Sequence, residues 1–126
     1  CMGTLEPERR KYIDFLLEAH NWTKEQLKPG IEASKICNDF YQLFVDAGYK
    51  DNYVYGPCHG TGMIEVEPPW METNSTYLLE PNMCFQVDSF ISGPGFGARW
   101  ELGASITSDG VEIMTNPVGV FHELGF

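Results

Sequence analysis

Apolar side chains recur at helical spacing in the first half of the chain. The first stripe follows Pro7, which suits the first turn of a helix, and it should stop at the Lys-Pro-Gly sequence of residues 28–30. The second stripe repeats at i, i+1, i+4 and i+5 through residues 36–45, and Gly48 follows it as a C-terminal cap. The pattern predicts two helices whose apolar faces need another layer to cover them.

The spacing of apolar residues becomes extended in the second half. Alternation over residues 83–88 predicts a strand, with Asp88 on the same face as Gln86. Residues 99–107 form another extended run. Because these runs supply a sheet for the helices to cover, we predict the α+β class, with two helices packed on one face of a curved, mainly antiparallel sheet.

Turn residues separate the extended runs. Arg99 and Glu101 share one face of their run, and the Ser-Asp-Gly sequence at 108–110 predicts a tight turn into residues 111–114, and so a hairpin. The glycine-rich residues 93–97 are expected to form a loop between strands. That loop does not lead from a strand into a helix, so it does not predict a nucleotide site.

Composition narrows the class of protein. The chain has 126 residues, of which 43% are hydrophobic, enough for one domain with one core. Its net charge of -10 disfavours nucleic acid and anionic membranes as partners, because both would be repelled. No run approaches the ~18 apolar residues of a membrane-spanning helix. The four cysteines lack C-x-x-C spacing, so we expect reduced thiols in a soluble, cytoplasmic protein.

Three side chains stand out as candidate metal ligands. His59, Asp88 and Glu101 supply one imidazole and two carboxylates, each in sequence typical of regular, buried structure. Taken singly, each has another interpretation: a capping histidine, an exposed aspartate, and a glutamate paired with Arg99. We expect the three to meet on the concave face of the sheet.

Five short motifs occur in a specific order along nearly the whole chain. They are His-Gly-Thr-Gly at 59–62, Glu-Pro-Pro at 67–69, Leu-Glu-Pro-Asn-Met at 79–83, Arg-Trp-Glu at 99–101 and Thr-Ser-Asp-Gly at 107–110. This order resembles the pita-bread metallohydrolases, which include methionine aminopeptidase, aminopeptidase P, prolidase and creatinase. Each motif alone is weak, but the ordered set is specific. The resemblance implies a partial pita-bread fold.

The resemblance also implies a ligand set. His59, Asp88 and Glu101 match the family's metal-binding histidine and two of its carboxylates, although glutamate is commoner at the position of Asp88. The family's other two ligands are aspartates further upstream, so residues 1–126 are expected to be the C-terminal part of a catalytic domain, truncated upstream. The complete domain would bind divalent metal, as Mn, Co, Zn or Fe. The resemblance leaves open whether these 126 residues alone bind one.

One departure from the family affects catalysis. Val66 stands where family peptidases carry a second histidine, and valine cannot donate a hydrogen bond or transfer a proton. Glu65 and Glu67 flank it and are the candidate acid/base residues. The alternative is that both are solvated surface glutamates.

Three functions fit these observations. The first is part of an Xaa-Pro aminopeptidase- or prolidase-like hydrolase, in which a dinuclear metal centre activates water to attack a peptide or amide bond. The second is a creatinase-like enzyme acting on a small non-peptide C-N substrate, and the third is a non-catalytic binding module. The isolated chain is expected to be inactive, and a homo-oligomer is expected to cover its exposed strand edges.

Overall fold

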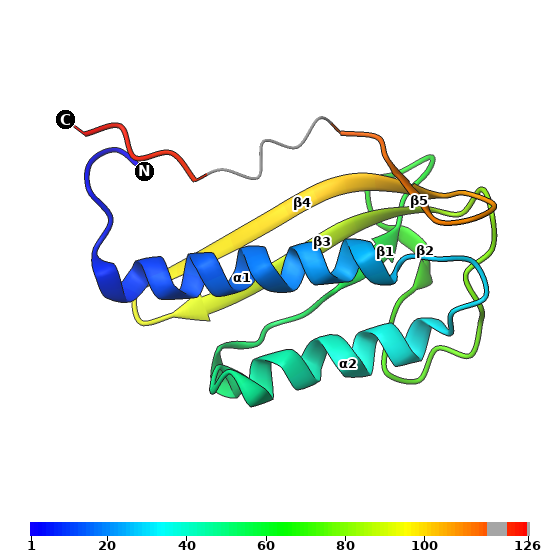
Figure 1. Ribbon diagram of the computed structural model, residues 1–126, viewed down its shortest axis with the longest axis horizontal. Helices are drawn as coiled ribbons and strands as arrows, with labels where there is room; N and C mark the ends of the chain where they lie inside the picture. The colour runs from blue at the N-terminus through cyan, green and yellow to red at the C-terminus, as the bar shows by residue number, and fades with distance from the viewer. Residues whose placement is uncertain (116–120, 126) are drawn as a thin grey trace.

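Two helices and five strands build the protein in the computed structural model, which describes residues 1–115 and 121–125 (Figure 1). The strands form one sheet in the order β2-β1-β3-β4-β5, and every neighbouring pair is antiparallel. The predicted α+β class is therefore confirmed. The elements are α1 (Pro7–Gln26), α2 (Ala33–Asp46), a short 3-10 turn η1 (Lys50–Asn52), β1 (Cys58–Gly60), β2 (Glu67–Trp70), β3 (Cys84–Gly93), β4 (Phe96–Ile106) and β5 (Val111–Ile113).

Both predicted helices are present. Pro7 occupies the first turn of α1, which ends just before the Lys-Pro-Gly sequence at 28–30. Gly48 follows the end of α2 with φ of +80°, a conformation that glycine adopts without the steric penalty of a β-carbon. The apolar stripe of α2 is buried, as its spacing predicts, and Phe40 and Phe44 are fully enclosed.

The core lies between the helices and one face of the sheet. Leu16 of α1, Phe40 and Phe44 of α2, and Ile91 of β3 pack in one cluster. A second cluster continues along the sheet through alternating strand residues such as Val87. α1 runs alongside β3 and β4 and covers this face (Figure 1). The alternation of β3 therefore directs Asp88, the next residue after Val87, to the opposite face.

The β3–β4 hairpin is longer than predicted. The expected loop at 93–97 is wrong in extent, because the two strands pair as far as Gly93 and Phe96 and leave only Pro94 and Gly95 in the turn. Gly95 has φ of +74°, as a tight turn requires. Glycines are typical of loops, but in this hairpin Gly93 and Gly97 belong to the paired strands and only Gly95 lies in the turn.

The spacing of apolar residues did not predict two of the strands, β1 and β2. β1 and β2 contain three and four residues, too few for an alternating pattern to be recognised. β1 nevertheless pairs with β3 and places His59 on an inner strand, between β2 and β3. The hairpin predicted at residues 108–110 is present and leads into β5.

Other expectations concern membranes and thiols. Within the described residues, neither α-helix is long and apolar enough to cross a bilayer. All four cysteines lie in the described part of the chain, and none of them is in a disulfide there. Asn82, just before β3, has φ of +73°, a conformation that asparagine tolerates better than most residues.

We predict that Leu16→Ala lowers the free energy of unfolding by about 2 to 5 kcal/mol, since it removes a fully buried side chain from the helix–sheet core. Leu78→Ala is the matched control, because the Leu78 side chain is 51% exposed and its loss should cost under about 1 kcal/mol. Urea denaturation of both variants measures the difference. Equal losses would contradict the core described above.

Candidate metal centre

His59 lies on β1 with its ring facing away from the helices. Its Nδ1 is 3.0 Å from the carbonyl oxygen of Gly60, and since a carbonyl only accepts, Nδ1 carries the proton and donates it. In the neutral ring, Nε2 then has a free lone pair. Nε2 is buried and has no hydrogen-bond partner in the described part of the chain. Metal-binding histidines commonly donate their other ring N–H to a backbone carbonyl in this way.

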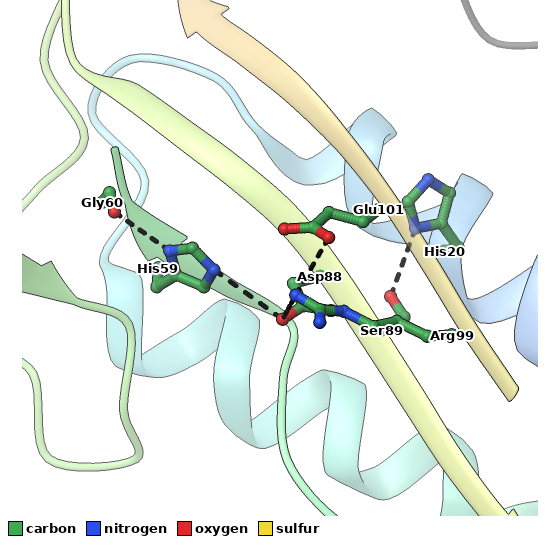
Figure 2. Close-up of polar contacts among 7 residues, drawn as sticks. All are labelled: His20, His59, Gly60, Asp88, Ser89, Arg99 and Glu101. Atoms are coloured by element: carbon green, nitrogen blue, oxygen red, sulfur yellow. Dashed lines mark hydrogen bonds and ion pairs between the residues drawn. The ribbon is translucent and has the colours of Figure 1, made fainter. Parts of the chain in front are cut away.

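Asp88 and Glu101 face each other across the β3–β4 pair (Figure 2). The Asp88 side chain is only 4% exposed, and that of Glu101 is 27% exposed. One ligand atom from each, together with one ring nitrogen of His59, lies within 4.8 Å of the others. The structure therefore brings together the three residues that the sequence singled out as metal ligands. Nitrogen and carboxylate donors in this number suit a divalent transition metal.

Arg99 joins the two carboxylates. Its Nε donates to Asp88 Oδ1 at 2.7 Å and its Nη2 donates to Asp88 Oδ2 at 3.0 Å. The same Nη2 lies 2.9 Å from Glu101 Oε2. The hydrogen bond to Asp88 raises the pKa of Arg99 above its ordinary value. The sequence suggested a pair between Arg99 and Glu101, but the bidentate contact with Asp88 was missed.

A cavity of about 890 Å³ opens beside these residues. His59, Asp88 and Arg99 form its charged and polar wall. Tyr55 and Trp70 contribute aromatic surface, and both are partly exposed. A polar wall next to aromatic surface is typical of sites that bind small molecules or peptides.

Glu65 and Glu67 occupy different positions around the cavity. Glu65 lines it together with Val66, whose exposure is 44%. Glu67 turns into its own loop, where Oε2 accepts the backbone N–H of Ile64 at 3.1 Å. A β-carbon at Gly62 would collide with Glu67 Oε1, so the loop is closed around this carboxylate. Glu65 is therefore the better placed of the two for chemistry, and Glu67 the better placed to shape the loop.

The aspartates of the helices do not approach the centre. Asp14 of α1 pairs with Arg10 at 2.8 Å, and Asp39 of α2 pairs with Lys35. Both pairs are exposed on helix surfaces and link residues one turn apart. Neither aspartate belongs to the group formed by His59, Asp88 and Glu101.

His20 lies behind the centre, on the helix face of the sheet. Its Nδ1 is 3.3 Å from Oγ of Ser89, the residue after Asp88, and both side chains are buried (Figure 2). Burial, followed by the charge of Lys24, lowers the pKa of His20 from 6.5 to about 4. The residues around His20 in the sequence carry no signal of this contact, because Ser89 lies 69 positions away along the chain.

Known proteins with similar sequences are metallopeptidases and dipeptidases. The sequence model of metallopeptidase family M24 matches residues 1–108. The Xaa-Pro dipeptidase of Lactobacillus helveticus is 30% identical over 115 residues, which are 90% of this chain and 31% of that protein. The probable dipeptidase PepE of Mycobacterium tuberculosis is 29% identical over 116 residues, 91% of this chain and 31% of that protein. The chain thus spans about a third of the length of these curated relatives.

Solved structures share the fold. Dipeptidase PepE from Mycobacterium ulcerans superposes with a TM-score of 0.92 at 23% identity, covering 99% of this chain and 34% of that one. An Xaa-Pro dipeptidase from Bacillus anthracis gives a TM-score of 0.91 at 25% identity, covering 98% of this chain and 35% of that one. The arrangement of two helices on an open antiparallel sheet is therefore that of the larger peptidase domains.

We predict that stability falls on acidification because His20 must stay neutral while it is buried. Its folded pKa of about 4 lies below the ordinary 6.5, so the unfolded chain binds the proton first and stability is lost as pH falls from about 6.5 towards 4. Between pH 7 and pH 5 the loss is about 2 kcal/mol at ~1.4 kcal/mol per pKa unit. Urea denaturation of wild type and His20→Gln at both pH values measures it. Equal pH dependence in the two proteins would show that His20 is not responsible.

Proposed function

Since the chain belongs to metallopeptidase family M24, we propose that it is part of the catalytic domain of a metal-dependent hydrolase of the Xaa-Pro dipeptidase type. The observation that carries the proposal is the meeting of His59, Asp88 and Glu101 within 4.8 Å, beside a large cavity that His59 and Asp88 line. The substrate would be a peptide, or a related small amide, held in that cavity.

The donor atoms fit a divalent metal. The ring of His59 offers a buried, unpartnered Nε2, and two carboxylates lie directly across the strand pair from each other. Like charges directly opposite on a sheet are destabilising unless a cation lies with them. Two bound ions would lower the pKa of a water molecule and polarise the scissile carbonyl. We propose Glu101 as the bridging ligand, with His59 and Asp88 on one ion, and Mn, Co, Zn or Fe as the metal.

Three protein donors are few for a dinuclear centre. The chain matches about a third of the length of its relatives, so we propose that the remaining ligands lie outside these 126 residues. Asp14 and Asp39 are paired with basic residues of their own helices, and Asp46 of α2 accepts a hydrogen bond from Gln42 on the helix surface. On this proposal the 126 residues are a C-terminal part of the catalytic domain and are inactive alone.

The other residues of the chain position the reactants. The Gly60 carbonyl holds the His59 ring in one tautomer, and the sheet keeps Asp88 out of water. Glu65, in the cavity wall, is our candidate for moving a proton to or from the substrate. Glu67, bonded to the backbone at Ile64, would assist by holding the loop that carries Glu65. The rings of Tyr55 and Trp70 would contact the substrate and exclude water.

Val66 favours a second candidate function. It lines the cavity but can neither donate a hydrogen bond nor transfer a proton. A diverged, creatinase-like enzyme acting on a small non-peptide C-N bond would not need a histidine there. A non-catalytic binding module is less well supported, because such a module has no use for a buried, unpartnered imidazole beside two carboxylates.

Assembly and location follow from the same proposal. β2 and β5 form the two edges of the sheet, and their outer sides have no partner strand among the described residues. Unpaired strand edges favour association. We propose a homo-oligomer, and the free cysteines suit a cytoplasmic location.

We predict that Glu101→Gln in the complete protein lowers kcat/KM for an Xaa-Pro dipeptide by about 100-fold or more, since it removes a charged ligand. Glu112→Gln, an exposed change on β5, is the matched control and should have no effect. Chelation by EDTA should abolish the wild-type rate.

The 126-residue chain with added Mn²⁺ or Co²⁺ should show no hydrolysis, and a measurable rate would refute the need for ligands from outside it.

We further predict that Val66→His raises kcat/KM for Xaa-Pro dipeptides by about tenfold or more, because it restores a group able to transfer a proton. Val54→His is the control, since Val54 lines the same cavity with similar exposure. Dipeptide hydrolysis by the complete protein measures both. If Val66→His gains nothing and small amides are cleaved instead, the creatinase-like function replaces the peptidase.

A further inference from the structure

Arg99 makes the densest set of polar contacts in the centre. Its guanidinium bonds both oxygens of Asp88, at 2.7 and 3.0 Å, and approaches Glu101 Oε2 to 2.9 Å. The nitrogen that contacts Glu101 is the same Nη2 that contacts Asp88 Oδ2. A single cationic nitrogen therefore lies between the two carboxylates (Figure 2).

This nitrogen uses oxygens that a metal ion would need. Asp88 Oδ2, one of its two partners, lies 3.7 Å from Nε2 of His59. One ligand atom each of His59, Asp88 and Glu101 lies within 4.8 Å of the others, so a metal ion held by the three would draw on the same two carboxylates. Arg99 cannot relieve a conflict with a metal ion by losing a proton, because a guanidinium stays charged in proteins. The conflict can be relieved only by movement.

The surroundings of Arg99 allow that movement. The Asp88 side chain is 4% exposed and fixed in the centre of the sheet, whereas the Arg99 side chain is 41% exposed. Arg99 extends across the sheet face from β4, diagonal to Asp88, and lines the open cavity. Its side chain can therefore turn into the cavity while both carboxylates stay in place.

We propose that Arg99 is an internal counter-ion that competes with divalent metal for Asp88 and Glu101. Without metal it neutralises the two facing carboxylates and holds them together. When metal binds, Arg99 releases at least one Asp88 oxygen. The inference rests on the proposed metal centre, and it adds that the metal affinity of the centre is set partly by a residue that is not a ligand.

The first experiment compares wild type with Arg99→Gln in the 126-residue chain. With EDTA present, Arg99→Gln should melt at a lower temperature, because Asp88 then lacks its cation. Added Mn²⁺ should raise the melting temperature of Arg99→Gln more than that of wild type. By calorimetric titration, Arg99→Gln should bind Mn²⁺ about tenfold more tightly, the equivalent of one charged hydrogen bond that no longer has to be broken.

Two variants control for charge and geometry. Arg10→Gln removes the same charge from an exposed pair with Asp14 and should leave the Mn²⁺ affinity unchanged. Arg99→Lys keeps the charge but loses the two-pronged contact with Asp88, so its affinity should fall between those of wild type and Arg99→Gln.

The second experiment needs no variant. In wild type, the Nε–H signal of Arg99 in a ¹⁵N NMR spectrum should reflect the bond to Asp88 and should shift when Zn²⁺ is added to saturation. A signal unchanged at saturation would overturn the inference.

The remaining outcomes separate the inference from the proposed function. Weaker or equal Mn²⁺ binding by Arg99→Gln would overturn the competition and make Arg99 a residue that only positions Asp88, with the metal centre intact. Failure of both wild type and Arg99→Gln to bind Mn²⁺ or Zn²⁺ would overturn the inference together with the three-residue centre in this chain.

Discussion

The register between β3 and β4 is the constraint on which the candidate centre depends. The two strands pair continuously from Cys84 with Ser105 to Gly93 with Phe96, and this pairing sets Asp88 opposite Glu101. Because side chains alternate between faces, a slip of one residue would turn Asp88 into the helix-covered core. Burial of the apolar face therefore also fixes the position of the carboxylates. The energy that holds the site together comes from packing on the other side of the sheet.

β3 carries two different kinds of polar group, one on each face. Asp88 points to the cavity, where it meets His59 and Arg99, while Ser89 points to the helices, where it meets His20. The first group is charged and needs a cation, and the second is neutral and needs to remain so. His20 and Asp88 thus place opposite electrostatic demands on the two faces of β3. Asp88, which belongs to the centre, and Ser89, which belongs to the packed core, are therefore neighbours in the same strand.

The sequence predicted the fold where the elements were long enough to show a period. Both helices and the face of Asp88 followed from spacing, and the motif order identified His59, Asp88 and Glu101, which the structure brings together. β1 escaped notice because three residues cannot show alternation, although it carries the histidine. The contact between Arg99 and Asp88 runs diagonally between strands, so it depends on side-chain direction as well as on register. Such contacts, and the cavity beside them, arise only once the strands are placed in space.

A carboxylate pair with one buried member, Asp88, constrains what can surround it. Asp88 is too enclosed for water to solvate it fully, and Glu101 adds a second negative charge directly across the strand pair. An uncompensated buried charge costs several kcal/mol, so a cation beside Asp88 stabilises the folded chain. The neutral ring of His59 offers only a lone pair and cannot supply this positive charge. Arg99 can supply it, and so can a metal ion. Arg99 therefore makes the centre stable enough to fold before any metal arrives, and the cost is a weaker affinity for the metal that follows.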